Sequence, residues 1–238
     1  VGDNPSIFGP IFWGVYQAYM AEHDEYSGTR LMTLITNAPG YIATTEQKIT
    51  TMEDLAGLKL RSAGPYATAL TEAIGAVPVL KPAPETYELL TTGVLDGTLI
   101  QPETMINFNA LGATKHFTVI PGGLFAAPLA IIINEASFAK LSEQDQQAII
   151  AISGRELAQE LSDDYQDATD SAMKTMAAEP GLTIATADAA MVEQIKSVIT
   201  PLEQDWADRA ADYGLADPAQ VLAEFRRRVA EAEAKQTN

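Results

Sequence analysis

The sequence predicts an α/β protein with a mainly parallel sheet that helices cover on both faces. Three observations support this class. Short helical and strand-forming stretches alternate between residues 51 and 100, as in successive βα units. Leu129–Ile133 is continuously apolar, which is typical of a central strand buried on both faces. A helical pattern from Ser142 to Met176 would be about 50 Å long at roughly 1.5 Å per residue. That length exceeds one small domain and indicates two.

The N-terminal part predicts a helix, a strand and a loop. Asn4-Pro5-Ser6 opens a helix with aromatic residues at helical spacing, and the charged segment 22–25 ends it. Residues 30–36 predict a buried strand, which the turn sequence 37–40 ends. A loop that contains Tyr41 follows.

The central part repeats a helix-strand pattern with glycine after helices and proline after strands. Thr51–Asp54 is a capping-type start of a short helix. The predicted elements that follow are the strand 58–61, the helix 65–74, the strand 77–80, the helix 84–92, the strand 98–100, a helix that Glu103 and Thr104 start, and the strand 117–120.

The C-terminal part is mainly helical. The long helix starts at Ser142 and continues to Met176, because no proline occurs before Pro180. A strand at 182–185 and a helical stretch at 189–213 follow, and Pro201 must kink or break that helix. The last helix runs from Pro218 to about residue 234.

Composition limits the possible functions. The chain has 238 residues, 47% hydrophobic and 20% charged, enough for a core in one large or two smaller domains. Its 15 Lys and Arg against 32 Asp and Glu produce a formal net charge of -17. That charge repels nucleic acid and anionic membranes, so we expect no nucleic-acid partner. No apolar run reaches the roughly 20 residues of a membrane span, and no signal peptide precedes Val1.

The side chains that usually carry catalysis are scarce. The chain has no cysteine, and its two histidines have no partner at metal-ligand spacing. No glycine-rich phosphate loop and no pair of carboxylates at catalytic spacing occurs. We therefore predict no metal site, no cofactor and no catalytic residue.

Arg61 is the strongest candidate for ligand binding. It ends the short apolar strand Gly57-Leu58-Lys59-Leu60-Arg61, and a helical stretch follows from Gly64. Small ligands bind at the carboxyl ends of strands in open α/β sheets. A guanidinium suits a carboxylate or phosphate through two parallel hydrogen bonds. Arg61 is therefore a candidate anion anchor, and the alternative is a surface arginine paired with a carboxylate of the protein.

An ordered series of segments resembles the solute-binding proteins of TRAP transporters, the DctP family. The resemblance rests on their order and spacing and covers essentially the whole chain. The segments are Met52–Arg61, Ala73–Val79, Pro84–Gly97, Gln101–Glu103, Thr114–Phe117, Ile132–Asn134 and Leu141–Asp145.

The resemblance implies a type II periplasmic-binding-protein fold, with two lobes interleaved in sequence and a long helix that spans both. Lobe one would hold residues 1–38 and 126–166, lobe two residues 39–125 and 167–216, and the helix within 217–238 would pack across both. Family members normally begin with two strand-helix units and a further strand, roughly 70 to 90 residues by the size of such units. This sequence starts after them, which a clipped protein, a fragment of a longer chain or an unresolved part of a crystal would each explain. Taken alone, this chain would have an incomplete lobe one, and we expect it to expose sheet edge and apolar surface.

The resemblance also implies a function. The protein would be periplasmic, with its signal peptide removed, would close on a small organic acid, and would deliver it to a sodium-coupled TRAP membrane permease through peripheral contact. It would catalyse no reaction. Two alternatives are a ligand-binding sensor domain and an enzyme on a two-lobed α/β scaffold, because fold alone does not define function.

Family roles transfer to particular residues. The arginine that ends the Gly-Leu-Lys-Leu-Arg strand binds the ligand carboxylate in this family, which implies that role for Arg61. The turn that starts at Gln101 normally supplies a polar side chain to the same carboxylate or its neighbour. Tyr41 stands where sialic-acid binders carry a second arginine, so a smaller hydroxy or keto acid is expected, aromatic acids included.

Three further residues have two interpretations each. Phe125 would form a pocket wall together with Tyr41, with Pro84 near it, or these side chains serve the core. Glu103 would accept a hydrogen bond from a ligand hydroxyl, or its carboxylate favours the start of the helix that follows.

Overall fold

The computed structural model describes residues 2–23 and 25–236, and the chain divides into two compact units. Unit 1 comprises the residues up to Asn37, Ala126–Asp167 and the residues from Ala207 on. Unit 2 comprises Ala38–Phe125 and Ala168–Trp206. The predicted α/β class is confirmed.

Most elements lie wholly in one unit. Those of unit 1 are α1 (Pro5–Tyr19), the 3-10 helix η1 (Ala21–His23), β1 (Thr29–Thr36), β7 (Pro128–Asn134), α5 (Glu135–Phe138), α6 (Glu143–Ala151) and α9 (Pro218–Gln236). Those of unit 2 are β2 (Tyr41–Thr44), η2 (Met52–Leu55), β3 (Lys59–Ser62), α2 (Gly64–Ala73), β4 (Val77–Leu80), η3 (Ala83–Glu85), α3 (Thr86–Thr91), β5 (Gly97–Ile100), α4 (Pro102–Asn107), η4 (Ala110–Ala113), β6 (His116–Val119) and β8 (Thr183–Thr186). The division falls inside α7 (Arg155–Ala177) and α8 (Ala189–Asp212).

Unit 2 is built on a six-stranded sheet with the order β4-β3-β5-β2-β6-β8. β3 lies between β4 and β5 and is parallel to both, and β6 is parallel to β8. β2 is antiparallel to β5 and β6, so the sheet is mixed rather than mainly parallel. The sequence predicted a loop at Tyr41. This was wrong, because pairing with two distant strands makes Tyr41–Thr44 a buried strand.

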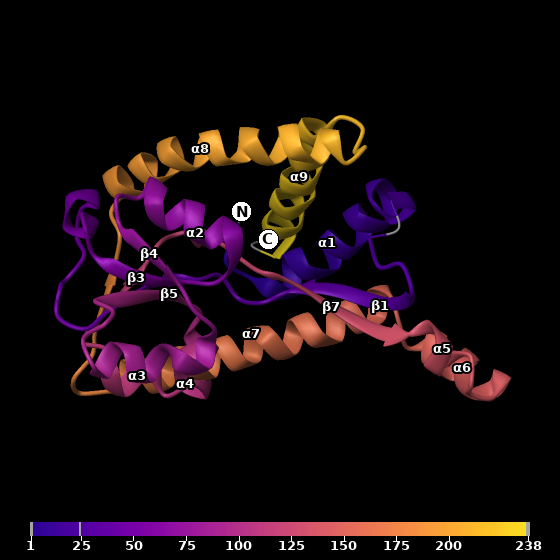
Figure 1. Ribbon diagram of the computed structural model, residues 1–238, viewed down its shortest axis with the longest axis horizontal. Coiled ribbons are helices and arrows are strands. Elements are labelled where there is room, and N and C mark those ends of the chain that lie inside the picture. The colour runs from indigo at the N-terminus through magenta and orange to yellow at the C-terminus, as the bar shows by residue number, and fades with distance from the viewer. Residues whose placement is uncertain (1, 24, 237–238) are drawn as a thin grey trace. The chain divides into compact units, whose positions relative to one another are not determined.

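The core of unit 2 lies on both faces of this sheet. Every residue of β5 is buried, as expected for a strand inside a covered sheet. Figure 1 shows α2 on one side of β3, β4 and β5, and α3 and α4 on the other. The short helix η2 starts with the predicted capping box, in which Thr51 and Asp54 bind each other's backbone.

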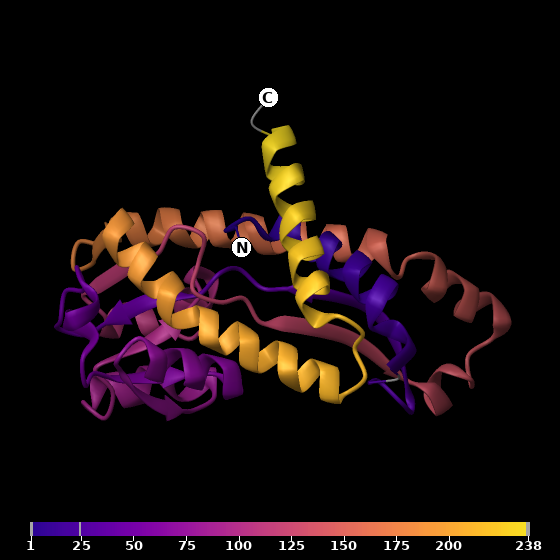
Figure 2. The same cartoon turned by 90° about the horizontal axis from the view of Figure 1, so that it is seen from above.

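Unit 1 contains a two-stranded antiparallel sheet of β1 and β7. α1 packs on β1, and α9 packs on α1 through an edge-to-face contact of Phe12 with Phe225 at 6.3 Å. Figures 1 and 2 both show α9 beside α1. The contacts therefore group α9 and the chain from Ala207 with unit 1. These bounds differ from the expected ones, which gave 207–216 to lobe two, and the packing of the last helix across both lobes stays a prediction.

The prediction of a central strand at 129–133 was wrong. Among the described residues, β7 pairs with β1 alone. Ile131 and Ile132 are 42% and 50% exposed. Because successive strand residues point to opposite faces, both faces of β7 expose apolar side chains. Sheet edge and apolar surface are thus exposed in unit 1, as the resemblance led us to expect.

The predicted long helix is two helices. α6 ends at Ala151 and α7 begins at Arg155, because Gly154 takes a left-handed conformation with φ +75° that interrupts the helix. The Gly154 N–H donates to the Met32 carbonyl at 2.6 Å, and the Thr33 hydroxyl donates to the Gly154 carbonyl at 2.8 Å. The turn is thereby fixed to β1. In both views α5 and α6 extend from the end of β7 (Figures 1 and 2).

Of the two predicted effects of Pro201, a kink or a break, the break does not occur. α8 continues through Pro201 from Ala189 to Asp212, although proline lacks the N–H that would donate to the preceding turn.

Candidate functional site

The carboxyl ends of β3 and β5 bring two predicted site residues to one edge of the unit 2 sheet. The strands are parallel neighbours, and Arg61 lies in register with Thr98. Arg61 is the third residue of β3, and Gln101 directly follows β5. Both residues therefore lie at the edge where open α/β sheets bind small ligands.

Arg61 is a buried cation with most of its donors unused. It is 4% exposed. Its Nε donates to the Lys81 carbonyl at 2.8 Å, and within the described chain it forms no salt bridge. Burial lowers the pKa of the guanidinium. A surface arginine paired with a protein carboxylate would show neither feature, so the environment favours an external anion.

The Lys81 carbonyl is a contributor that sequence reasoning missed. It belongs to the loop after β4, and its bond to Nε orients the guanidinium so that the terminal nitrogens remain available. The ion pair of Lys81 with Glu85 at 3.0 Å links the ends of this loop. A backbone acceptor leaves no signal in side-chain patterns, so the sequence could not predict it.

Gln101 is well placed to supply a polar group. It is 6% exposed and caps α4 through its backbone carbonyl, which accepts from the Met105 N–H at 3.0 Å. Within the described chain its side-chain amide has no hydrogen-bond partner. The amide is therefore available to a ligand.

Tyr41 and Phe125 are the two aromatic candidates. Gly40, the residue before Tyr41, pairs with Phe125, but the two aromatic rings differ in their environment. Tyr41 starts β2 and packs edge-to-face on Phe117 at 5.7 Å, inside the unit 2 core. Phe125 forms an isolated bridge with Gly40, and its ring fills the space where a Gly40 Cβ would lie, 2.2 Å from Cε1. The packing of Tyr41 favours its core role. Phe125 is only partly buried and can also face a ligand.

Glu103 is a buried acid in the first turn of α4. It is 6% exposed, its Oε2 lies 3.5 Å from the Thr169 hydroxyl on α7, and its Oε1 is buried without a partner among the described residues. Burial raises its pKa to about 7. Its contact with α7 favours a packing role at the helix start over contact with a ligand.

Pro84 lies in η3, in the loop whose Lys81 carbonyl holds Arg61. Its ring is exposed. It therefore belongs to the loop that contacts Arg61 and is accessible to solvent.

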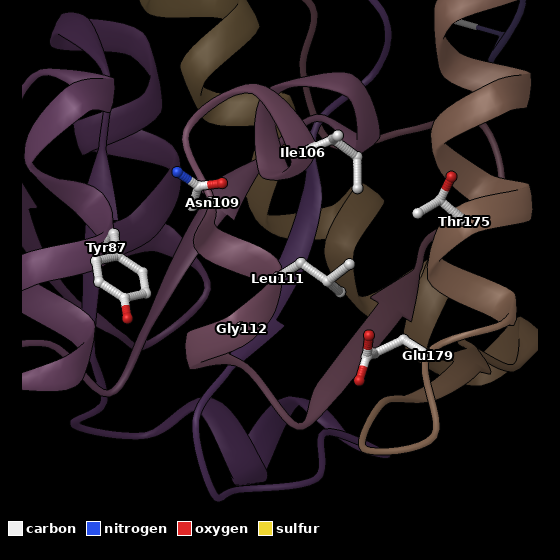
Figure 3. Close-up of a pocket in the computed structure, with 7 residues that line it drawn as sticks. All are labelled: Tyr87, Ile106, Asn109, Leu111, Gly112, Thr175 and Glu179. Atoms are coloured by element: carbon white, nitrogen blue, oxygen red, sulfur yellow. The ribbon is translucent and has the colours of Figure 1, made fainter.

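Unit 2 also has a hollow of about 550 Å³, and none of the candidate residues lines it (Figure 3). Its lining comes from α3, α4, η4 and the end of α7 and consists of Tyr87, Ile106, Asn109, Leu111, Gly112, Thr175 and Glu179. None of these seven residues is basic, and Glu179 contributes a carboxylate. This hollow therefore suits an organic acid less well than the edge that carries Arg61.

No group of three His, Asp or Glu side chains gathers in the described chain in an arrangement that could hold a metal ion. Among the described helices, none is both long and apolar enough to cross a membrane.

Solved structures similar to this chain are TRAP periplasmic solute-binding proteins. One from Bordetella bronchiseptica with bound (R)- and (S)-mandelate is 35% identical, with a TM-score of 0.90 over 97% of this chain and 72% of that one. One from a marine metagenome, specific for aromatic acid ligands, is 25% identical, with a TM-score of 0.88 over 97% and 72%.

The curated outer membrane transporter protein TsaT of Comamonas testosteroni is 28% identical over 204 residues. The match covers 85% of this chain and 60% of that protein. The chain thus spans about 60% of the length of this relative.

The model of the family described as bacterial extracellular solute-binding protein, family 7 (DctP), matches residues 12–209. The match includes β1, β3 and β5 with Arg61 and Gln101, and it confirms the resemblance found in the sequence. This chain belongs to the DctP family of bacterial extracellular solute-binding proteins.

Proposed function

We propose that this protein is the extracytoplasmic solute-binding protein of a TRAP transporter. It binds a small organic acid, a hydroxy or keto carboxylate, and delivers it to a sodium-coupled membrane permease. Family membership supports the class of protein. The observation that carries the binding role is Arg61, a buried guanidinium with no acidic partner in the described chain.

The ligand carboxylate binds the terminal nitrogens of Arg61. The Nε bond to the Lys81 carbonyl holds the guanidinium plane, so both nitrogens of the fork are available for two parallel hydrogen bonds. Gln101 pairs with the same carboxylate or with a neighbouring hydroxyl or keto oxygen. Because Arg61 is largely buried without a counterion in the described chain, pairing with a ligand carboxylate offsets part of its desolvation cost.

Closure of the two lobes on the acid completes binding. The acid first meets Arg61, and its other polar groups then pair with the opposite lobe. The bound acid makes more contacts in the closed state than in the open state. The closed state is therefore favoured only when the ligand is present. This two-step capture is how a binding protein presents a loaded form to its permease, and it requires no chemical step.

The ligand class is an acid of modest size with one carboxylate and an apolar or aromatic body. The similar protein from Bordetella bronchiseptica was solved with mandelate, which carries a hydroxyl beside its carboxylate and a phenyl ring. Phe125 is partly buried at the same sheet edge and offers an apolar contact for such a ring. Arg61 neutralises one negative charge, which matches a monocarboxylate.

The test is native mass spectrometry of the full chain purified without added ligand, followed by calorimetric titration. We expect a small acid to be retained, or (R)-mandelate or benzoate to bind with micromolar or tighter affinity. Succinate serves as the dicarboxylate comparison. If no acid is retained and none of a broad panel of hydroxy, keto and aromatic acids binds, the proposal is wrong.

The periplasmic location and the permease partner are tested separately. Fractionation of the source cells should place the protein in the periplasm. Uptake of the bound acid should require both this protein and a neighbouring pair of large and small permease subunits. A fused kinase or cyclase in place of that pair would favour the sensor alternative.

A further inference from the structure

We propose that unit 1 carries a second binding site, for a small oxyanion of the phosphate type, between α1, the start of α7 and α9. A cavity of about 240 Å³ lies there. Its lining residues are Ile11, Gly14, Arg155, Arg228, Glu231, Ala232 and Lys235. The site lies wholly in unit 1, whereas Arg61 belongs to unit 2.

Two guanidinium groups converge on Gly14 of α1. A Cβ built on Gly14 would lie 3.8 Å from Arg228 Nη1 and 4.0 Å from Arg155 Nη1. Both terminal nitrogens therefore lie close to one point above α1. A tetrahedral anion has several oxygens and can accept hydrogen bonds from two donors at such a separation. Gly14 keeps this point free of a side chain.

Arg155 is unusual because it lacks a partner. Within the described chain it forms no side-chain hydrogen bond and no ion pair, and its Nη1 lies 4.0 Å from the same built Gly14 Cβ that Arg228 Nη1 approaches. The chain has 32 acidic against 15 basic residues, so a basic side chain on its surface would ordinarily find a carboxylate. Two guanidinium nitrogens within about 4 Å of one point indicate a place for an anion.

The geometry of Arg228 leaves its terminal nitrogens available. Its Nε donates to Glu224 at 2.7 Å, and this ion pair fixes the guanidinium with Nη1 towards Gly14. Lys235 on the same helix adds a third cation to the lining. The position of Arg155 as the first residue of α7 adds the positive end of a helix of 23 residues.

The charges of the lining favour a doubly charged oxyanion. Glu231 is the carboxylate among these residues, and its Oε1 already accepts from Arg227 Nη1 at 2.5 Å, so it is engaged outside the convergent pair. Three cations and one carboxylate line the cavity, and Arg228 also pairs with Glu224 outside the lining. The local charge stays positive inside a chain of net charge -17, because Arg227 also pairs with both Glu224 and Glu231. Phosphate at neutral pH matches both this charge and the number of donors.

The test is calorimetric titration of the full chain with inorganic phosphate at low ionic strength. We expect saturable binding to the unmodified protein and at least about tenfold weaker binding to Arg155→Ala, because one charged hydrogen bond is lost. Lys140→Ala is the matched control. It removes an exposed cation of unit 1 outside the cavity, and phosphate affinity should stay within twofold.

Two outcomes would overturn the proposal. The first is no saturable phosphate binding, or equal binding by Arg155→Ala and Lys140→Ala. The second is co-sedimentation with phosphatidylglycerol vesicles that Arg155→Ala abolishes, without binding of free phosphate, because the cluster would then serve a lipid surface. Arg155→Ala should leave binding of the organic acid intact, so the result is independent of the function proposed for Arg61.

Discussion

Replacement of Arg61 by alanine should strongly weaken ligand binding and leave the fold intact. The residue is 4% exposed and forms no salt bridge in the described chain. The unliganded protein therefore loses one hydrogen bond to the Lys81 carbonyl and one buried charge without a counterion. These changes offset each other in the free energy of unfolding.

The bound state has no such compensation. A ligand carboxylate left buried without its cation costs roughly 3 to 5 kcal/mol. Because about 1.4 kcal/mol corresponds to a factor of ten, affinity should fall at least roughly a hundredfold. The assay is calorimetric titration with the acid that native mass spectrometry identifies, or with (R)-mandelate, together with a thermal melt of each variant.

Lys59→Ala is the matched control. It removes the same charge from the same strand, two residues earlier, at an exposed position, and its affinity should be unchanged. Arg61→Lys keeps the charge and loses the planar fork, so its affinity should lie between those of the alanine variant and the unmodified protein. Near-normal binding by a folded Arg61→Ala variant would refute the reasoning.

The remaining predictions concern stability, measured by urea unfolding. Burial raises the pKa of Glu103 to about 7 from 4.5, so the folded state keeps a proton that the unfolded state releases. The free energy of unfolding should fall by about 3 kcal/mol from this group as pH rises from 4.5 to 7, and Glu103→Gln should remove that fall and be the more stable protein at pH 8. An unchanged pH dependence in the variant would contradict this. Gly154→Ala should lose roughly 1 to 2 kcal/mol, because its φ of +75° is strained for a residue with a Cβ. Gly40→Ala should lose roughly 1 to 3 kcal/mol, because the new Cβ would meet the Phe125 ring at 2.2 Å. Gly112→Ala is the control for both, since a Cβ there meets nothing within 4 Å, and equal stability of all three glycine variants would show that these contacts are unimportant.

Local signals in the sequence were sufficient for most helices and several strands. The capping box at Thr51 and the cap at Ser142, which accepts from the Asp145 N–H at 3.1 Å, mark the helix starts that the sequence predicted. These signals act over three or four residues. They can therefore be recognised without knowledge of the fold.

The wrong predictions depend on contacts between distant segments. Tyr41–Thr44 is a strand because β5 and β6 flank it, and four residues carry too little periodicity to show this. The continuous apolar run at 129–133 predicted a central strand. Whether a strand is central depends on which strands pair with it, and those are distant in sequence. The sequence did not reveal the helix break at Gly154, because a glycine can also be tolerated inside a helix. The hydrogen bonds of Gly154 to β1 stabilise the turn that separates the two helices.

The candidate site shows the same limit. Arg61 could be predicted because strand and arginine are adjacent in sequence, and its pairing beside β5 explains why Gln101 lies at the same edge. The Lys81 carbonyl and the convergence of Arg155 with Arg228 could not be predicted, since they join segments separated by many residues.

Among the described residues β7 pairs with β1 alone, and hydrogen exchange of its amides in solution can test whether its other edge is open. In an antiparallel edge strand, alternate amides point to the partner and the others point outward. Along Pro128–Asn134, amides bonded to β1 should therefore exchange slowly with deuterium and those between them rapidly. Uniform protection along the strand would reveal that another strand pairs with its open edge, and the exchange pattern would show where that strand begins and ends.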